Sequence, residues 1–208
     1  MTCPSTYKSH RSTHELMKCS TVAVFWVTLF AGVPTNQPRP KFVVPPRLVT
    51  IPVSQSQQAS QTVVAFLNWY KIHLLPISRI LLINQLPGKP YSVNLENGER
   101  YLAYLKSSHL LTDTYLGEWR TYFKERDAGF RLTRQDEGPP TGFEYDLVML
   151  NQEVDKQMAS LKLLKIDKVT IVRSRATVAF TLLESYEFRL VKQNGLWMIN
   201  EILNIGAE

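Results

Sequence analysis

Cysteine is scarce in this sequence: among its 208 residues it occurs only as Cys3 and Cys19. Residues 20–208 therefore contain no thiol, which excludes a disulfide framework and a cysteine nucleophile from that part of the chain. A domain without cysteine suits an envelope compartment, where unpaired thiols would oxidise.

Recognised catalytic and cofactor-binding motifs are also missing. The sequence contains no Gly-x-Ser-x-Gly motif, no glycine-rich phosphate-binding loop and no dinucleotide fingerprint. Its histidines are isolated, and no spacing of His, Asp and Glu is typical of a metal site. These absences argue against the common hydrolases, kinases and dehydrogenases, and we expect neither a cofactor nor a bound metal. They do not exclude an enzyme whose fold has no short signature.

The charge pattern gives no sign of a nucleic-acid partner. The formal net charge is +6, and residues 1–31 hold three of the 24 basic and one of the 18 acidic side chains, which leaves 21 and 17 in the rest. Basic and acidic residues are interleaved there, without an arginine-rich arm or a basic stripe with aromatics. We therefore expect no nucleic-acid binding.

An apolar run of about thirteen residues, 21–33, lies near the start of the sequence. It is too short for a membrane-spanning helix, which takes roughly twenty residues. Lys18 precedes it and a proline-rich stretch follows, an order typical of a secretory signal peptide. Because residues 1–16 make an unusually long polar leader, we expect the true start at Met17 and assign residues 1–33 to an over-extended start plus signal peptide. These features predict a periplasmic or secreted protein with no stable membrane span. Alternatively, the apolar run is a buried strand or an uncleaved anchor.

Residues 34–54 are predicted to be a linker, because proline is concentrated there. Six of the twelve prolines fall in this segment: Pro34, Pro38, Pro40, Pro45, Pro46 and Pro52. The folded domain is therefore expected to cover residues 55–208.

A long helix is predicted at the start of that domain. Ser54 and Gln57 fit a capping box, and Pro76 is expected to end the helix. The apolar residues between them have helical spacing and form one stripe, Val63, Phe66, Leu67, Tyr70 and Leu74. Residues 77–86 fit either a second short helix or a buried connector.

Two further helices are predicted before residue 130. After a loop at Asn97-Gly98, a short helix is expected over residues 99–107, with Tyr101 among its inward residues. The next helix begins near Thr112 or Asp113 and continues to about Arg126, with Gly129 as its C-terminal stop.

The second half of the domain is predicted to be antiparallel strands. Residues 161–172 and 175–183 read as strands joined by a turn at Arg173-Ser174, and Glu184-Ser185 as the next turn. Residues 143–150 fit either a strand or a short helix. Helices followed by a meander of strands define an α+β fold, in which N-terminal helices pack on one face of a curved antiparallel sheet.

The last two strands form the clearest hairpin of the sequence. Asn194-Gly195 separates two alternating apolar runs, and a type I′ turn needs two residues that tolerate positive φ. A two-residue loop pairs Lys192 with Trp197 and places Glu201 opposite Phe188, on the apolar face. Trp197 is therefore expected in the core.

The order of these elements resembles the nuclear transport factor 2-like superfamily, whose members have a cystatin-like cone fold. The strand at residues 176–180 and the ending at residues 188–199 carry the resemblance, which covers roughly residues 58–205. The resemblance implies a cone-shaped cavity between sheet and helices, which some relatives use for catalysis and others for holding a ligand.

A narrower resemblance is to a bacterial envelope family of that fold with no assigned function. It is carried by Phe66-x-x-Trp69-Tyr70 and by Tyr145-Asp146 followed by Gln152. It implies an exported domain and, as one form, an immunity-type protein that blocks the active site of a toxin.

Five residues are candidates for binding a ligand: Tyr70, Tyr145, Asp146, Gln152 and Glu201. Glu201 on the apolar face is a candidate general base, unless it lies solvated at the strand end. Tyr70 fits a core residue with a locally bonded hydroxyl better than it fits a catalytic donor. For Asp146 and Gln152, a capping or loop-bonding role fits as well as a binding role. We expect Asp146 to have an ordinary carboxylate pKa, because it lies beside a glycine-containing loop.

Two functions are consistent with these patterns. The first is non-catalytic binding of a small ligand or a protein partner; the alternative is an isomerase- or dehydratase-like enzyme that uses an acidic residue in the cone cavity. A homodimer is compatible with either.

Overall fold

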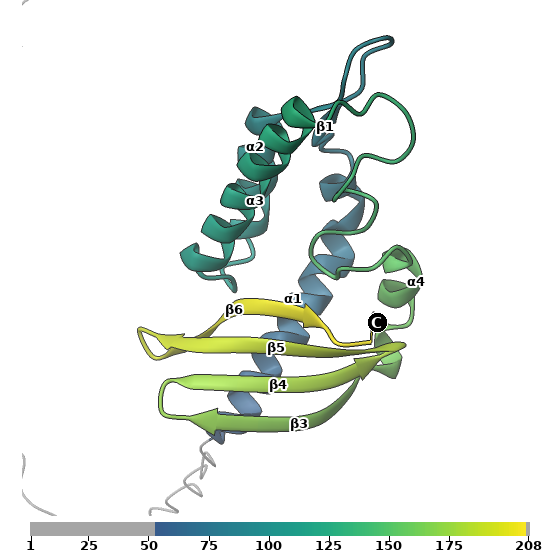
Figure 1. Cartoon of the computed structure of the whole chain (residues 1–208). Coiled ribbons are helices and arrows are strands. Elements are labelled where there is room, and N and C mark those ends of the chain that lie inside the picture. Colours follow the sequence, from purple (N-terminus) through teal and green to yellow (C-terminus); the bar gives the residue numbers. More distant parts are fainter. Residues whose placement is uncertain (1–52, 207–208) are drawn as a thin grey trace, which may run out of the picture. The chain divides into compact units, whose positions relative to one another are not determined.

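The computed structural model describes residues 53–206, which form an α+β domain, as predicted (Figure 1). The helices are α1 (Gln55–Ser78), α2 (Leu95–Lys106), α3 (Asp113–Leu132) and α4 (Val154–Ala159), with a 3-10 turn at Leu161–Leu163. The strands β1 (Ile83–Asn84) and β2 (Ser92–Val93) pair with each other. The strands β3 (Lys165–Val172), β4 (Arg175–Leu182), β5 (Glu184–Gln193) and β6 (Leu196–Asn204) form a four-stranded antiparallel sheet in that order.

The predicted signal peptide and nearly all of the proline-rich linker lie outside the described residues. Among residues 53–206, no helix is both long enough and apolar enough to cross a membrane.

Helix α1 follows the predicted pattern at its start and along its length. Its N-cap Ser54 accepts a hydrogen bond from the Gln57 N–H at 3.2 Å, and every residue of the predicted apolar stripe is buried. The predicted stop at Pro76 is wrong by two residues. Pro76 lies in the last turn, where its missing N–H costs one helical hydrogen bond, and the burial of Ile77 offsets that loss.

Helix α2 begins earlier than predicted, and the assignment of Asn97-Gly98 to a loop is wrong. Asn94 caps the helix by accepting from the Asn97 N–H at 3.0 Å. Gly98 is buried, and a Cβ there would lie 3.0 Å from the Phe123 ring of α3. The glycine therefore serves a close approach of α2 to α3 and not a turn.

Helix α3 has the predicted cap but not the predicted end. Thr112 Oγ1 accepts from the Tyr115 N–H at 3.1 Å. The helix continues past Gly129 to Leu132, because Phe130 extends the buried face by another turn. Gly129 is exposed and tolerated inside the helix.

The sheet is the predicted meander, with two corrections to its boundaries. Residues 161–163 form a 3-10 turn, so the strand expected from residue 161 begins at Lys165. The turn after β4 centres on Leu183, which has φ of 62° and lies between the paired residues Leu182 and Glu184. Glu184-Ser185 therefore belong to β5. The turn at Arg173-Ser174 is as predicted.

The final hairpin keeps the predicted register only as far as Leu190, which pairs with Ile199. A β-bulge at Asn200 then shifts the pairing, so that Arg189 faces Glu201 and Phe188 faces Ile202. The prediction that Glu201 lies on the apolar face is therefore wrong, because one extra residue in β6 turns its side chain to the opposite face. Asn200 itself accepts a hydrogen bond from Thr112 Oγ1 at 3.0 Å.

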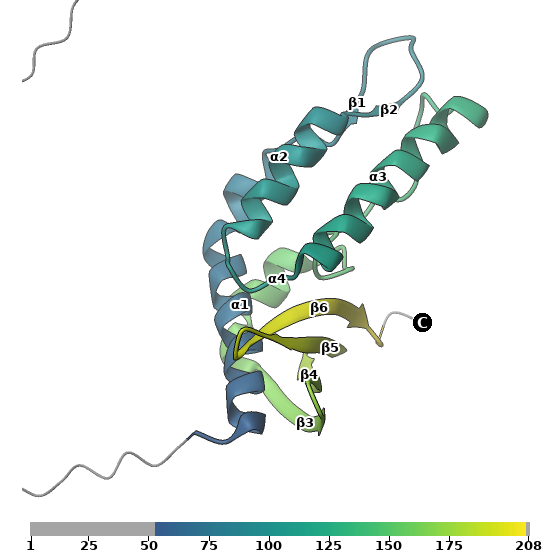
Figure 2. The same ribbon diagram turned by 90° about the vertical axis from the view of Figure 1, so that its left-hand side faces the viewer.

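Helix α1 covers one face of the sheet, while α2 and α3 lie on the β6 side in both views (Figures 1 and 2). The covered face is closely packed, with Phe188 6.2 Å from the ring of Phe66 and 5.0 Å from that of Phe180. Trp197 is 4% exposed, as expected for a core residue, and Trp69 is half-buried.

Candidate functional site

A pocket of about 420 Å³ lies at the C-terminal end of α1. Its apolar lining consists of Leu74, Ile77, Ile80, Leu81, Leu82, Ile83, Pro140, Phe143, Leu147 and Val154, and its polar lining of Ser78, Gln85, Tyr101, Tyr145, Asp146 and Asp155. Strands β3 to β6 contribute none of these residues. The pocket therefore does not lie between the sheet and the helices, where the sequence resemblance implied a cavity. Buried side chains such as Phe180 and Phe188 fill that region.

The carboxylate of Asp146 is fixed in place by three hydrogen bonds. Its Oδ1 accepts from the backbone N–H groups of Val148 at 3.1 Å and Met149 at 2.7 Å. Its Oδ2 accepts from the hydroxyl of Tyr70, on α1, at 2.5 Å. The side chain thus ties the turn at residues 147–150 to the long helix. The segment that was ambiguous between strand and short helix is neither, since it is a series of turns closed by a bridge between Asp146 and Asn151.

Burial raises the pKa of Asp146 above its ordinary value. The hydrogen bonds from Tyr70 and from the two backbone N–H groups act in the opposite direction, because they stabilise the charged form. The expectation of an ordinary carboxylate pKa is therefore wrong. The sequence placed Asp146 beside an exposed loop and gave no sign that the turn folds back on α1.

Three buried tyrosines surround this carboxylate. Burial raises the pKa of Tyr70 and Tyr101 well above the ordinary value, with the Asp146 charge a further cause, and burial also raises the pKa of Tyr115. All three hydroxyls consequently stay protonated at neutral pH. That of Tyr70 donates to Asp146, whereas the buried hydroxyl of Tyr115 has no hydrogen-bond partner among the described residues. Tyr101 is 4% exposed and lines the pocket, and its hydroxyl has no hydrogen-bond partner among residues 53–206.

The structure brings three of the five predicted site residues together. Tyr145 and Asp146 line the pocket. Tyr70 does not line it but donates a hydrogen bond to Asp146. Gln152 is exposed and does not line the pocket. Glu201 lies on β6, where its Oε2 accepts from Arg189 Nη1 at 2.8 Å, and it takes no part in this site.

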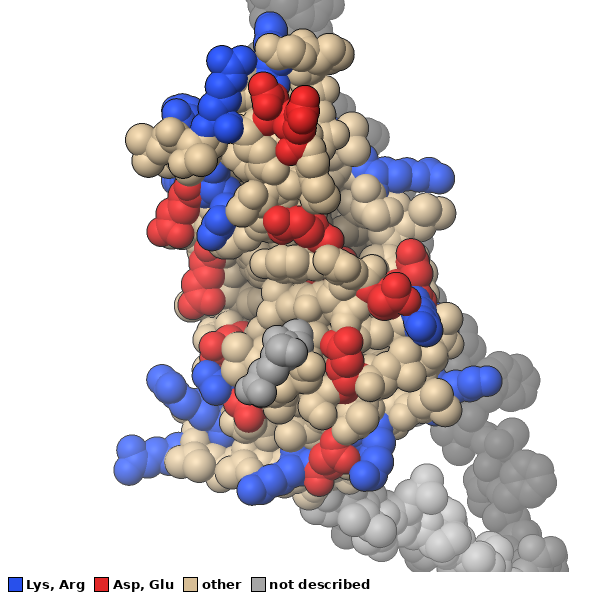
Figure 3. All heavy atoms as spheres, turned by 45° about the vertical axis from the view of Figure 1, so that its right-hand side comes forward, with Lys and Arg blue, Asp and Glu red and all other residues tan. Residues whose placement is uncertain are grey.

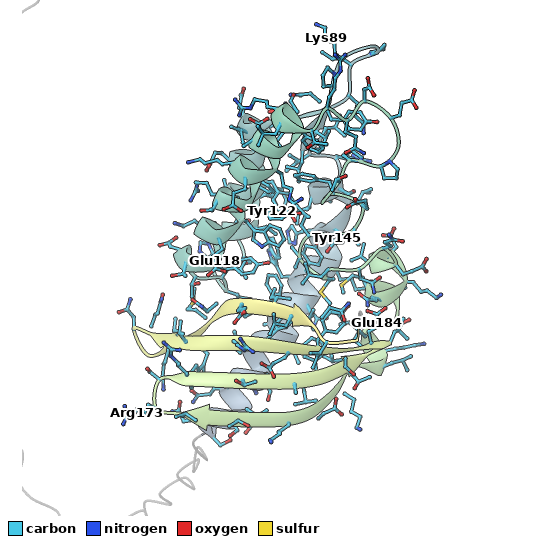
Figure 4. The ribbon with its side chains drawn as sticks, in the orientation of Figure 1. Lys89, Glu118, Tyr122, Tyr145, Arg173 and Glu184 are labelled. Carbon is cyan, nitrogen blue, oxygen red and sulfur yellow. The ribbon has the colours of Figure 1, made fainter. Side chains whose placement is uncertain are left out.

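Tyr145 lies beside α3, next to Tyr122 (Figure 4). The Tyr122 hydroxyl donates to the Gly142 carbonyl at 2.7 Å, which fixes the segment before Tyr145 against α3. Burial raises the pKa of Tyr122, with Tyr145 as a further cause. Together with the hydrogen bond between Asp146 and Tyr70, this contact anchors the 140–150 segment, which forms part of the pocket wall, to two helices.

Three lining residues that could interact with a ligand were not among the predicted site residues: Tyr101, Phe143 and Asp155. Helical spacing identified Tyr101 as inward, and a buried tyrosine hydroxyl that needs a partner is a usable signal of a polar site. No comparable signal marked Phe143 or Asp155, because residues 143–160 have no clear periodicity. Within residues 53–206, no group of three His, Cys, Asp or Glu side chains is placed to hold a metal ion.

Comparison with known proteins yields no significant match to a protein-family model, to a curated protein or to a solved structure. The function of the pocket is therefore inferred from its own geometry.

Proposed function

We propose that residues 53–206 form a binding domain that holds a small, mainly apolar molecule in the pocket at the end of α1, without catalysing a reaction on it. The observation that carries this proposal is a pocket of about 420 Å³ with apolar walls and a few fixed polar groups. Binding sites for small molecules are typically concave, mostly apolar and roughly 300–1,000 Å³ in volume. Asp146, Tyr101 and Tyr145 are the polar groups that would orient the molecule.

The hydrogen bonds of Asp146 support an anchoring role over a catalytic one. Its Oδ1 already accepts from two backbone N–H groups, and its Oδ2 from Tyr70. A general base must instead accept a proton from its substrate, and the donors that hold Asp146 favour its charged form.

A second candidate function is acid–base catalysis of the isomerase or dehydratase type. The raised pKa of Asp146 favours it, because buried carboxylates with raised pKa values are frequent general acids and bases. If this candidate is correct, Asp146→Asn abolishes turnover of the bound molecule and leaves its binding intact.

We also propose membership of the nuclear transport factor 2-like superfamily and export to the periplasm or beyond. The succession of α1 to α3 and a four-stranded meander supports the first proposal, and the apolar run at residues 21–33 supports the second. A fusion of residues 17–33 to a reporter that is active only outside the cytoplasm tests export; an inactive reporter would contradict it.

Filling the pocket tests the proposed function. Ser78 lines the pocket on α1, whereas Ser56 is an exposed serine in the first turn of the same helix. We expect the full chain to bind the neutral fluorescent dye Nile red, the Ser78→Trp variant to bind it at least about tenfold more weakly, and the Ser56→Trp control to match the wild type. Equal binding by all three proteins would show that the dye does not enter this pocket.

A further inference from the structure

The pocket lining is acidic, although the chain as a whole is basic. Among residues 53–206, the charged residues that line the pocket are Asp146 and Asp155, without any Lys, Arg or His. Residues 140–160 contain four acidic and one basic side chain, whereas the net charge of the chain is +6. The one base, Lys156, pairs with Glu153 at 3.4 Å, outside the pocket.

The face that carries α4 and the preceding loop shows the same trend. In Figure 3 its acidic side chains lie mostly in the middle, and Lys and Arg side chains lie mostly near the margins. Acidic side chains gathered on one face favour the approach of a positively charged molecule to that face.

Asp146 has no cationic partner within the described residues, which distinguishes this half-buried carboxylate from the buried one of Asp127. Asp127 is 7% exposed, accepts from the Val93 N–H and forms an ion pair with Arg131. Asp146 is held by a hydroxyl and two backbone N–H groups alone. A half-buried carboxylate without a counter-ion has lost part of its hydration, and a bound cation would offset part of that loss.

The aromatic lining supplies a second kind of attraction. Tyr101, Phe143 and Tyr145 all line the pocket beside the two carboxylates. Aromatic faces attract ammonium groups electrostatically, and aromatic walls with carboxylates are a common way to bind amines. The unpartnered hydroxyl of Tyr101 adds one group that can orient a ligand.

We infer that the ligand is an organic cation: an amine or quaternary ammonium group on an apolar body, with the cation near Asp146 and the body against the apolar walls. This inference rests on the proposed binding function. Asp146 would supply the counter-charge, Asp155 a second negative charge at the pocket wall, and the aromatic rings the contact with the ammonium group.

Three molecules that share one apolar body test the charge preference. We expect the full chain, studied by isothermal titration calorimetry at neutral pH, to bind 4-phenylbutylamine at least about tenfold more tightly than 4-phenylbutanol. We expect no measurable binding of 4-phenylbutyrate. Equal or tighter binding of the alcohol or the carboxylate would overturn the inference but leave the proposed function intact. Binding of none of the three, together with no binding of Nile red, would overturn both.

Three variants locate the charge that matters. Asp146→Asn should weaken binding of the amine about tenfold and leave that of the alcohol unchanged, and Asp155→Asn should weaken the amine to a smaller extent. Glu153→Gln is the matched control, because Glu153 is exposed two residues from Asp155 and does not line the pocket. Since Asp155 is exposed and makes no structural hydrogen bond within residues 53–206, its variant keeps the test valid even if Asp146→Asn alters the fold. Unchanged amine binding by both pocket variants would contradict the inference.

Discussion

The four-stranded sheet and the pocket both depend on α1, but they use its buried face in different ways. Along its first half, α1 packs Val63, Phe66 and Leu67 into a core that the sheet closes completely. At its C-terminal end the same face continues with Leu74 and Ile77, which line an open pocket. A helical stripe therefore shows which face of a helix is apolar, but it does not show whether protein or a ligand covers that face.

The largest expected effect is that of removing an aromatic ring from the closed region. Phe188 is fully buried between Phe66 and Phe180, so Phe188→Ala should lower the free energy of unfolding by about 3–5 kcal/mol. Phe143 is half-buried at the pocket wall, so Phe143→Ala removes less buried apolar surface than Phe188→Ala and should cost about 1 kcal/mol. Urea denaturation of both variants measures the difference. Equal losses of unfolding free energy would mean that the pocket region is packed as tightly as the sheet, and would contradict the distinction between the two regions.

The two tryptophans of α1 and β6 give a smaller contrast. Trp197→Ala should cost about 3 kcal/mol, at the low end for a buried ring, because its indole N–H has no hydrogen-bond partner among the described residues and no such bond is lost. Trp69 is half-buried and stacks on His73 at 4.3 Å, so Trp69→Ala should cost about half as much. Denaturant midpoints compare the two, and a greater loss at Trp69 would contradict this ranking.

The sequence predicted the closed region better than the pocket region, for a physical reason. The stripe of α1 and the alternation in β4 are periodic, and periodicity follows directly from burial of one face. The exceptions are set by tertiary contacts: Gly98 lies in a helix because Phe123 packs on it, and the bulge at Asn200 lies where β6 meets Thr112. Neither contact leaves a local signal.

The candidate site was predicted in part, and on a resemblance more than on a pattern. Tyr145 and Asp146 line the pocket and Tyr70 bonds to Asp146, but these residues were named together because they resemble a family motif. Their meeting depends on a loop without periodicity that folds back on α1. Gln152 follows Asp146 in sequence yet points away from the pocket, since the turns between them reverse the chain.

The ionisation of Asp146 should make the stability of the domain depend on pH, in the opposite direction to Asp167 on β3, whose pKa is lowered by its hydrogen bonds from Thr181 and Lys165. Its folded-state pKa is raised above the ordinary 3.8, so the folded protein binds this proton more tightly than the unfolded protein does. The stabilisation is complete below pH 3.8 and is lost as the pH rises through the raised pKa. Each unit of the shift corresponds to about 1.4 kcal/mol.

Asp146→Asn removes this dependence, because asparagine does not titrate. The stability of the variant relative to the wild type should therefore increase as the pH rises from about 4 towards neutrality. Thermal unfolding of both proteins across that range measures the difference. A constant difference would show that the carboxylate has an ordinary pKa and would weaken the acid–base candidate in particular.

The smallest effect is expected at Glu201, the predicted site residue that the bulge moves to the outer face of the sheet. Its ion pair with Arg189 is largely exposed to solvent, and exposed pairs contribute little to stability because water and salt screen them. Glu201→Gln should therefore leave the urea midpoint almost unchanged, and its small effect should vanish at high salt. Binding of Nile red and of 4-phenylbutylamine should match the wild type, because β6 contributes nothing to the pocket. Weaker binding by this variant would return Glu201 to the site and would place the ligand on the sheet rather than at the end of α1.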